Sequence, residues 1–99
     1  LVDITKLFMF QSLTELSKLA AVLGDFYKGK NDLYEDIATH RYYLLVSKSS
    51  QSPEEFNKVC NILSEYGSQQ AYSPATEAFF GEHYRLVIKG KALQMLAAL

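Results

Sequence analysis

The chain has 99 residues, of which 48% are hydrophobic and 21% are charged, and its formal net charge is -1. This composition excludes a disordered chain, and the length corresponds to one domain with a small core. The near-neutral charge gives no electrostatic reason to expect nucleic acid or an anionic membrane surface as a partner.

The start of the chain and its one cysteine indicate a cytoplasmic domain of a longer protein. No apolar stretch approaches the length of a membrane span, and no signal-peptide pattern follows Leu1. Because Leu1 stands where a complete protein would have methionine, we expect residues 1–99 to be a single domain taken from a longer chain. Cys60 has no internal disulfide partner, which favours a reducing, cytoplasmic compartment.

The chain opens with a predicted strand and a predicted helix. Residues 7–10 (LFMF) are a continuous apolar run, typical of a strand that is buried on both faces. Ser12 and Glu15 form a capping-box pattern, and Gly24 is placed to end the helix. Between them runs an apolar stripe at spacings of three and four residues, made of Leu13, Leu16, Ala20 and Leu23.

A hairpin is predicted next. Residues 25–32 are interpreted as a loop, residues 33–37 (LYEDI) as a short strand, and residues 38–40 (ATH) as a turn. Residues 41–48 (RYYLLVSK) form the stronger strand, apolar on both faces. Alternation divides the first strand into two faces, one with Leu33, Glu35 and Ile37 and the other with Tyr34 and Asp36.

The second helix has the clearest local signal. Ser52 is predicted as its N-cap, Pro53 occupies the first helical position, and Glu55 completes a capping box. We expect Tyr66 to anchor the last turn and Gly67 to leave the helix in a left-handed conformation. The buried stripe is expected to consist of Phe56, Val59, Cys60 and Leu63.

The remaining residues predict a second hairpin and a final helix. Residues 75–80 (ATEAFF) and 84–88 (YRLVI) are interpreted as two strands, with a single helix as the alternative that the pattern leaves open. Residues 91–99 are predicted to be helical, with Leu93, Leu96 and Ala97 on one side, and to cover part of the opposite face of the sheet.

The predicted order is therefore β-α-β-β-α-β-β-α. Its first six elements match the split βαβ, or ferredoxin-like, arrangement of an α+β domain, in which two helices cover one face of an antiparallel sheet. The added hairpin and the C-terminal helix extend this unit.

Candidate catalytic and metal-binding residues find a simpler structural explanation. Cys60 with His40 or His83 would suggest a thiol nucleophile, but Cys60 lies on the apolar stripe of its helix and is expected in the core. Two histidines and one cysteine without paired spacing match no zinc pattern, and the glycines form no phosphate-binding loop. We expect no enzyme activity, no cofactor and no metal.

The tyrosines on the predicted hairpin have two interpretations. Tyr34, Tyr42 and Tyr43 could stack RNA bases on an open sheet face. The strands lack the basic residues of such a module, so core packing or a protein-contact surface explains the rings better.

Asp32, Glu35 and Asp36 form a small acidic group on the same hairpin, with Arg41 beside it. As general acids or bases they lack a neighbouring nucleophile, and a solvated edge is the simplest interpretation. The functional alternative is that these four residues form a partner-binding edge.

Taken in order, these segments resemble the C-terminal domain of the MecA adaptor family. The resemblance covers residues 6–99 and is carried by "LY" at a strand start, "YYLLV", the capped helix that closes in "LSEYG", then "EH", "VIKGKAL" and a final helix. It implies a non-enzymatic adaptor domain that binds a ClpC-type AAA+ unfoldase, promotes its assembly and activity for proteolysis with ClpP, and so exerts negative control over genetic competence. A separate N-terminal domain would bind the substrate proteins.

A regulatory domain that binds a small molecule on the same scaffold is the alternative function. It would need a pocket with converging polar groups at a loop edge.

Overall fold

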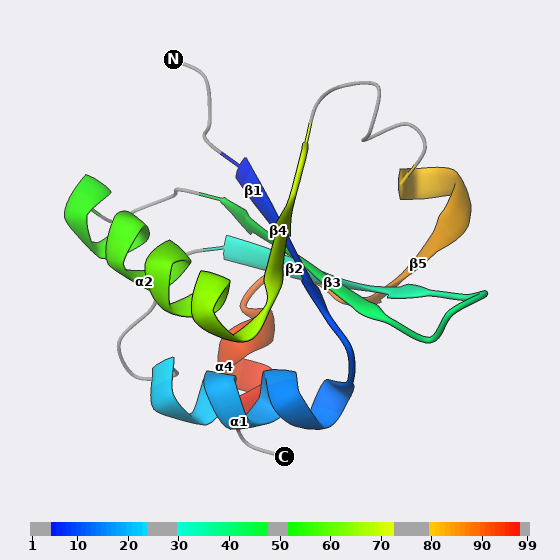
Figure 1. The fold of residues 1–99 in the computed structure, drawn as a ribbon, viewed down its shortest axis with the longest axis horizontal. Helices are drawn as coiled ribbons and strands as arrows, with labels where there is room; N and C mark the ends of the chain where they lie inside the picture. Colours follow the sequence, from blue (N-terminus) through cyan, green and yellow to red (C-terminus); the bar gives the residue numbers. More distant parts are fainter. Residues whose placement is uncertain (1–4, 24–29, 48–51, 73–79, 98–99) are drawn as a thin grey trace.

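The computed structural model describes residues 5–23, 30–47, 52–72 and 80–97, which form an antiparallel five-stranded sheet with helices packed on one face (Figure 1). The strand order is β4-β1-β3-β2-β5. The order of the first four strands confirms the split βαβ arrangement, and β5 extends the sheet beside β2. In chain order the elements are β1 (Thr5–Phe10), α1 (Leu13–Leu23), β2 (Lys30–Asp36), β3 (Tyr42–Ser47), α2 (Pro53–Tyr66), β4 (Ser68–Gln70), β5 (Tyr84–Ile88) and α4 (Ala92–Ala97).

Both predicted helix starts are confirmed. The Ser12 hydroxyl accepts a hydrogen bond from the backbone N–H of Glu15 at 3.3 Å, and the Ser52 hydroxyl accepts one from the N–H of Glu55 at 3.2 Å. Each hydroxyl satisfies one of the amide groups that the first turn of a helix leaves without an intrahelical partner. Pro53 occupies the first turn of α2, where its missing N–H costs nothing.

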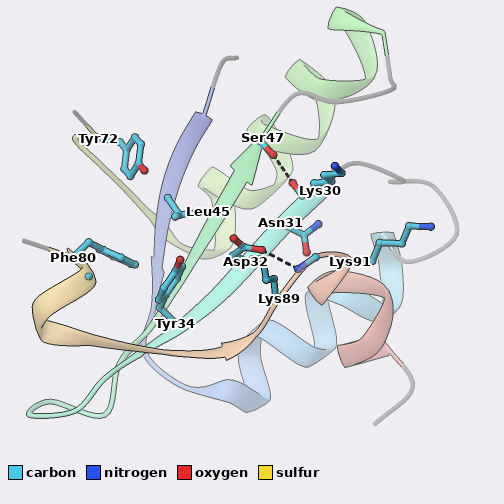
Figure 2. Close-up of a pocket in the computed structure, with 12 residues that line it drawn as sticks. Lys30, Asn31, Asp32, Tyr34, Leu45, Ser47, Tyr72, Phe80, Lys89 and Lys91 are labelled. Atoms are coloured by element: carbon cyan, nitrogen blue, oxygen red, sulfur yellow. Dashed lines mark hydrogen bonds between the residues drawn. The ribbon is translucent and has the colours of Figure 1, made fainter. Parts of the chain in front are cut away.

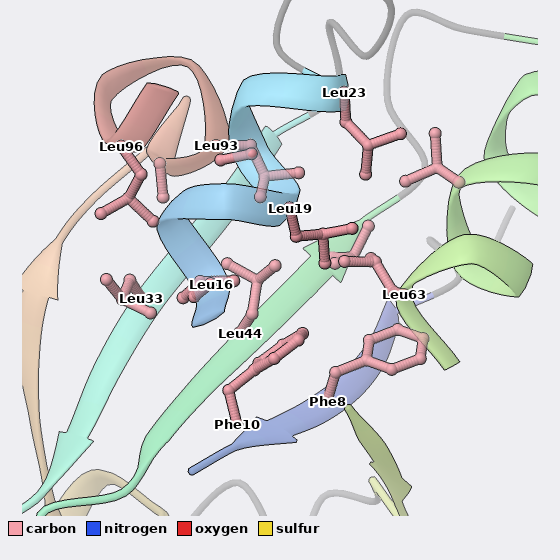
Figure 3. Packing of buried hydrophobic residues seen from close by; sticks show 14 of the residues in the cluster. Phe8, Phe10, Leu16, Leu19, Leu23, Leu33, Leu44, Leu63, Leu93 and Leu96 are labelled. Carbon is pink, nitrogen blue, oxygen red and sulfur yellow. The ribbon is translucent and has the colours of Figure 1, made fainter. Parts of the chain in front are cut away.

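The main core lies between the helices and one face of the sheet (Figure 3). Alternation along β1 and β3 sends Phe8, Phe10, Leu44 and Val46 to this side, and each is almost completely buried. The predicted stripe of α2 is confirmed, because its four apolar residues are all buried. The partners from the other elements are Leu16, Leu19, Leu23, Leu33, Leu93 and Leu96.

The prediction for the last helix was wrong about its face. Leu93 and Leu96 belong to the same core cluster as the α1 leucines, so α4 packs beside α1 rather than on the opposite face. Asn31 fixes this position, because its buried side-chain oxygen accepts a hydrogen bond from the backbone N–H of Leu93 at 3.0 Å. The side-chain oxygen of a strand residue thus satisfies an amide in the first turn of α4, as an N-cap residue does elsewhere.

The end of α2 also differs from its prediction. Gly67 does end the helix, but its φ of -123° and ψ of 177° are extended rather than left-handed. Space explains the glycine instead, since a Cβ atom at this position would lie 2.8 Å from the carbonyl oxygen of Met9 and 2.8 Å from the ring of Phe10. Tyr66 does not anchor the last turn, because 61% of its surface is exposed.

Three further differences concern strands. The predicted loop over residues 25–32 was wrong for residues 30–32, which begin β2 and pair with β3. The short strand β4 was not predicted. β5 is confirmed, but Phe80 is helical together with residues 81–83 rather than in a strand. The remaining predictions for Gly24, Lys48 and residues 25–29, 75–79 and 98–99 lie outside the described residues.

Candidate functional site

The hairpin between β2 and β3 carries three of the four residues predicted as a partner-binding edge. The carboxylate of Asp36 accepts hydrogen bonds from the backbone N–H groups of Ala38 at 2.9 Å and Thr39 at 3.3 Å, which closes the turn. His40 completes the turn with a φ of 57°, and Arg41 follows it with an exposed side chain. The turn therefore places a carboxylate and a guanidinium at the tip of the hairpin.

The charge of Asp36 is stabilised at this tip. Partial desolvation acts against it, but hydrogen bonds from Thr39 and Ala38 and the charge of Arg41 together hold the pKa of the Asp36 carboxyl below its usual value. Asp36 is therefore ionised at neutral pH, as a contact with a basic surface would require.

Glu35 lies on the other face of β2 and connects the hairpin to β5. Its carboxylate accepts a hydrogen bond from the hydroxyl of Tyr42 at 3.1 Å and forms an ion pair with Arg85 at 2.7 Å. Desolvation and the bond to Glu35 raise the pKa of Tyr42. Glu35 is thus committed to contacts within the domain, and the exposed Arg85 side chain continues the charged edge onto β5.

Asp32 is separated from this group. It lies near the start of β2, and its carboxylate accepts a hydrogen bond from the backbone N–H of Gly90 at 2.8 Å (Figure 2). Gly90 has a φ of +83°, in the left-handed region that glycine adopts readily, and this allows a tight turn between β5 and α4. The hydrogen bond from Gly90 to the Asp32 carboxylate holds this turn in place. The structure therefore brings Glu35, Asp36 and Arg41 to the hairpin end of β2 and leaves Asp32 at the other end.

A pocket of about 780 Å³ lies at that other end, on the sheet face opposite the main core. Its aromatic residues are Tyr34, Tyr72 and Phe80, and its lysines are Lys30, Lys89 and Lys91. In the view of Figure 2 the aromatic residues lie on the left and the lysines on the right. Asp32 and Leu45 lie between the two groups.

The predicted tyrosines are divided between the two faces. Tyr34 and Tyr43 pack edge-to-face against the buried ring of Phe80, with centroid distances of 4.6 and 5.7 Å. Tyr42 packs on the side of the main core. Tyr84 also contacts Phe80, and desolvation together with a hydrogen bond to Tyr43 raises the pKa of Tyr84 to about 12. The rings thus pack mainly on one another.

Cys60 is buried, as predicted, while His40 and His83 are exposed. Burial raises the pKa of the Cys60 thiol, against the opposing charge of Lys6. Among the described residues, no three His, Cys, Asp or Glu side chains group as they would around a metal ion. Within the same residues, no helix is long and apolar enough to cross a membrane.

We expect the Cys60 thiol to react with an aromatic disulfide reagent at least about 100-fold more slowly in the folded chain than in urea, since reaction requires opening of α2 and ionisation of a buried thiol. The measurement is the stopped-flow absorbance of the released thiolate, with Cys60→Ser as the blank. A fast reaction of the folded protein would contradict the placement of Cys60 in the core.

The comparison with known families decides the affiliation of this fold. The family model described as "Negative regulator of genetic competence (MecA)" matches residues 2–96. The chain belongs to the MecA family. No curated protein matches the chain.

Solved structures agree with this affiliation at the level of the fold. The MecA-family chain is similar to the "crystal structure of the C-terminal domain of MecA", with a TM-score of 0.77, 22% identity and 96% of each chain covered. It is also similar to a chain of the "MecA-ClpC complex revealed by cryo-EM", with a TM-score of 0.72 and 23% identity over 95% of this chain and 93% of that one. For the "c-terminal domain of YpbH" the TM-score is 0.72 and the identity is 18%, over 99% of this chain and 100% of that one.

Sequence reasoning missed the pocket of this MecA-family domain. Two signals could have indicated it. Lys30, Asp32 and Tyr34 share one face of a strand by alternation. Lys89 and Lys91 flank a glycine that follows an apolar strand, where a turn returns the chain to the sheet. Nothing in the sequence, however, shows that these two segments meet.

Proposed function

We propose that this MecA-family chain is a non-enzymatic adaptor domain that binds a ClpC-type AAA+ unfoldase in the cytoplasm. It promotes assembly and activity of the unfoldase for proteolysis with ClpP, as in negative control of genetic competence. The observation that carries the proposal is the family match over residues 2–96. The likeness to a chain of the MecA-ClpC complex supports it.

The proposed role needs a stable scaffold and a contact surface rather than catalytic groups. The unfoldase supplies the energy of ATP hydrolysis, and the protease supplies the chemistry. We further propose that this domain is the C-terminal, unfoldase-binding part of a longer adaptor, in which a separate N-terminal domain binds the substrate proteins.

The direct test mixes the 99-residue chain with a ClpC-type unfoldase and ATP. Gel filtration and the ATPase rate are measured on the same samples. We expect a larger complex together with a raised ATPase rate. A folded chain that neither enters the complex nor changes the rate would contradict the proposed function.

We propose that the hairpin edge of Asp32, Glu35, Asp36 and Arg41 faces the unfoldase. Support comes from the tip geometry, where Asp36 is ionised beside the exposed Arg41. This support is limited to the hairpin tip, because Asp32 lies at the other end of β2, where it holds the turn at Gly90.

We expect Asp36→Asn combined with Arg41→Gln to weaken unfoldase binding about tenfold, since each lost charge pair at an interface rim contributes up to about 1 kcal/mol. Asparagine retains the side-chain oxygen that accepts from Ala38 and Thr39, so the turn is preserved. The measurement is the dissociation constant by biolayer interferometry at two salt concentrations. Lys18→Gln combined with Glu15→Gln on the exposed surface of α1 is the matched control. Equal affinity of the hairpin variant and the control would exclude this edge.

The pocket keeps the small-molecule alternative testable. Its volume lies within the range of ligand sites, about 300–1,000 Å³. A thermal-shift screen with metabolites separates the two functions, because a tight ligand raises the melting temperature by mass action and an adaptor scaffold gives no such shift.

A further inference from the structure

The pocket combines an apolar wall and a basic rim on the sheet face opposite α1, α2 and α4. Alternation places Tyr34 of β2 and Leu45 of β3 on this face, away from the main core. Neither the split βαβ scaffold nor the hairpin edge proposed above accounts for this combination of an apolar wall and a basic rim.

The apolar wall is already ordered. Phe80 is only 3% exposed, and its ring packs against those of Tyr34 at 4.6 Å and Tyr84 at 4.3 Å. Tyr34 and Tyr72 remain partly exposed at the pocket surface. An apolar side chain that enters the pocket therefore meets rings whose positions are fixed, and little ordering of the protein is needed on binding.

The basic rim results from the turn at Gly90. The Asp32 carboxylate accepts a hydrogen bond from the Gly90 N–H, and this turn brings the exposed Lys89 and Lys91 beside Lys30 at the start of β2. Three lysines and one aspartate give the pocket lining a formal charge of +2, whereas the whole chain carries -1. The pocket lining thus carries a local positive charge, which attracts an anionic group.

The lining favours a peptide over a phosphate group. Lysine ammonium groups attract carboxylates and phosphates alike, so the rim alone selects only for negative charge. The Asp32 carboxylate, however, has lone pairs left to accept an N–H, a donor that a peptide backbone has and a phosphate group lacks. The separation of the lysines from the aromatic rings matches an extended ligand with acidic groups and an aromatic side chain (Figure 2).

We propose that this pocket binds an acidic peptide segment of a partner protein, with glutamate or aspartate at the lysine rim and an aromatic side chain against Tyr34, Tyr72 and Phe80. The pocket shares Asp32 with the proposed unfoldase edge but contains none of Glu35, Asp36 and Arg41. The two tests change different residues, so each proposal can fail without the other.

The test titrates the isotope-labelled 99-residue chain with a short blocked peptide in which glutamates flank a central phenylalanine. Chemical-shift changes in its NMR spectrum are expected at residues 30–34, 45 and 89–91. A peptide with alanine in place of phenylalanine should bind about three- to tenfold more weakly, because contacts between aromatic rings change an affinity by about that factor. A peptide with lysine in place of glutamate should not bind. Shifts confined to the helices would overturn the proposal.

Charge reversal gives the matched comparison. Lys89→Glu combined with Lys91→Glu should weaken peptide binding about tenfold or more, and salt should weaken binding to the unaltered chain. Lys18→Glu combined with Lys58→Glu makes the same change in net charge on α1 and α2 and should leave the affinity within about twofold. All four positions are exposed, and unchanged melting curves confirm folding. If both double variants lost peptide affinity equally, the net charge of the chain would explain the effect, and the proposed site would be wrong.

Two competitors exclude other ligand classes. A single-stranded oligouridylate should not displace the peptide, and neither should free N-acetylphenylalanine mixed with glutamate. Displacement by the oligonucleotide at a lower concentration than by unlabelled peptide would assign the pocket to nucleic acid instead. Displacement by the free amino acids at the same concentration as the peptide would assign it to a small carboxylate.

Discussion

Leu44→Ala is expected to lower the free energy of unfolding by about 3–4 kcal/mol, whereas Leu45→Ala, one position further, should cost about 1 kcal/mol. Leu44 is completely buried between the sheet and the helices. Leu45 points to the opposite face, where it is only partly buried. Both substitutions remove the same atoms from the same strand. The difference between their losses of unfolding free energy therefore reports how much more tightly the helix side of the sheet is packed.

The measurement is urea unfolding followed by far-ultraviolet circular dichroism. The two variants are compared with one common value for the dependence of the unfolding free energy on urea concentration. A domain of this size has a total stability of about 5–10 kcal/mol, so the Leu44 variant should remain folded at low temperature but lose a large part of its margin. Equal destabilisation by the two substitutions would contradict the weaker packing of the sheet face that carries Leu45.

Gly67→Ala should destabilise the chain by about 2–3 kcal/mol, which is large for a glycine with ordinary backbone angles. The cause is the close approach of β1, because the added Cβ atom would lie 2.8 Å from the Met9 carbonyl oxygen and from the Phe10 ring. The Met9 carbonyl belongs to a strand that is paired on both sides, so it cannot move without disturbing the sheet.

Two other glycines provide the controls. Gly81 has nothing within 4 Å of an added Cβ atom and lies in the helical residues 80–83, so Gly81→Ala should be neutral or stabilising by up to about 1 kcal/mol. Gly90 also has open space but a φ of +83°, so Gly90→Ala should cost about 1–2 kcal/mol through backbone strain alone. A loss at Gly67 no larger than that at Gly90 would contradict the steric explanation. Melting temperatures by differential scanning calorimetry distinguish the three cases.

The sequence predicted what depends on neighbouring residues. Hydroxyl caps at Ser12 and Ser52 act over three residues, and the apolar stripe of α2 repeats within four, so both could be recognised without knowing the fold. The same holds for β1 and β3, whose apolar runs are long enough to exclude a surface position.

What depends on partners distant in the chain could not be predicted. Lys30 and Asn31 are polar and resemble a loop, but they become strand residues because β3 offers a row of backbone partners. β4 has three polar residues, and only its pairing with β1 defines it. The leucines of α4 indicate an apolar side but not the layer on which it packs, which the Asn31 side chain helps to determine.

The same limit applies to the candidate sites. Nearness in sequence grouped Asp32 with Glu35 and Asp36, but β2 separates them along its length and between its faces. The contacts that locate Asp32 come from Gly90, 58 residues away. The pocket could not be inferred for the same reason, since its residues come from several parts of the chain (30–34, 45–47, 72, 80–81 and 89–91) that meet only in the folded chain.

The packing of α4 against α1 has a consequence for synthesis on the ribosome. The leucines of α1 face Leu93 and Leu96, so an early helix is covered by one that is made late. A nascent chain that has reached residue 70 contains β1 to β4, α1 and α2, yet the leucine stripe of α1 still lacks these partners. Final closure of the core must therefore wait until residue 96 has left the exit tunnel, and until then a chaperone has an apolar surface to bind.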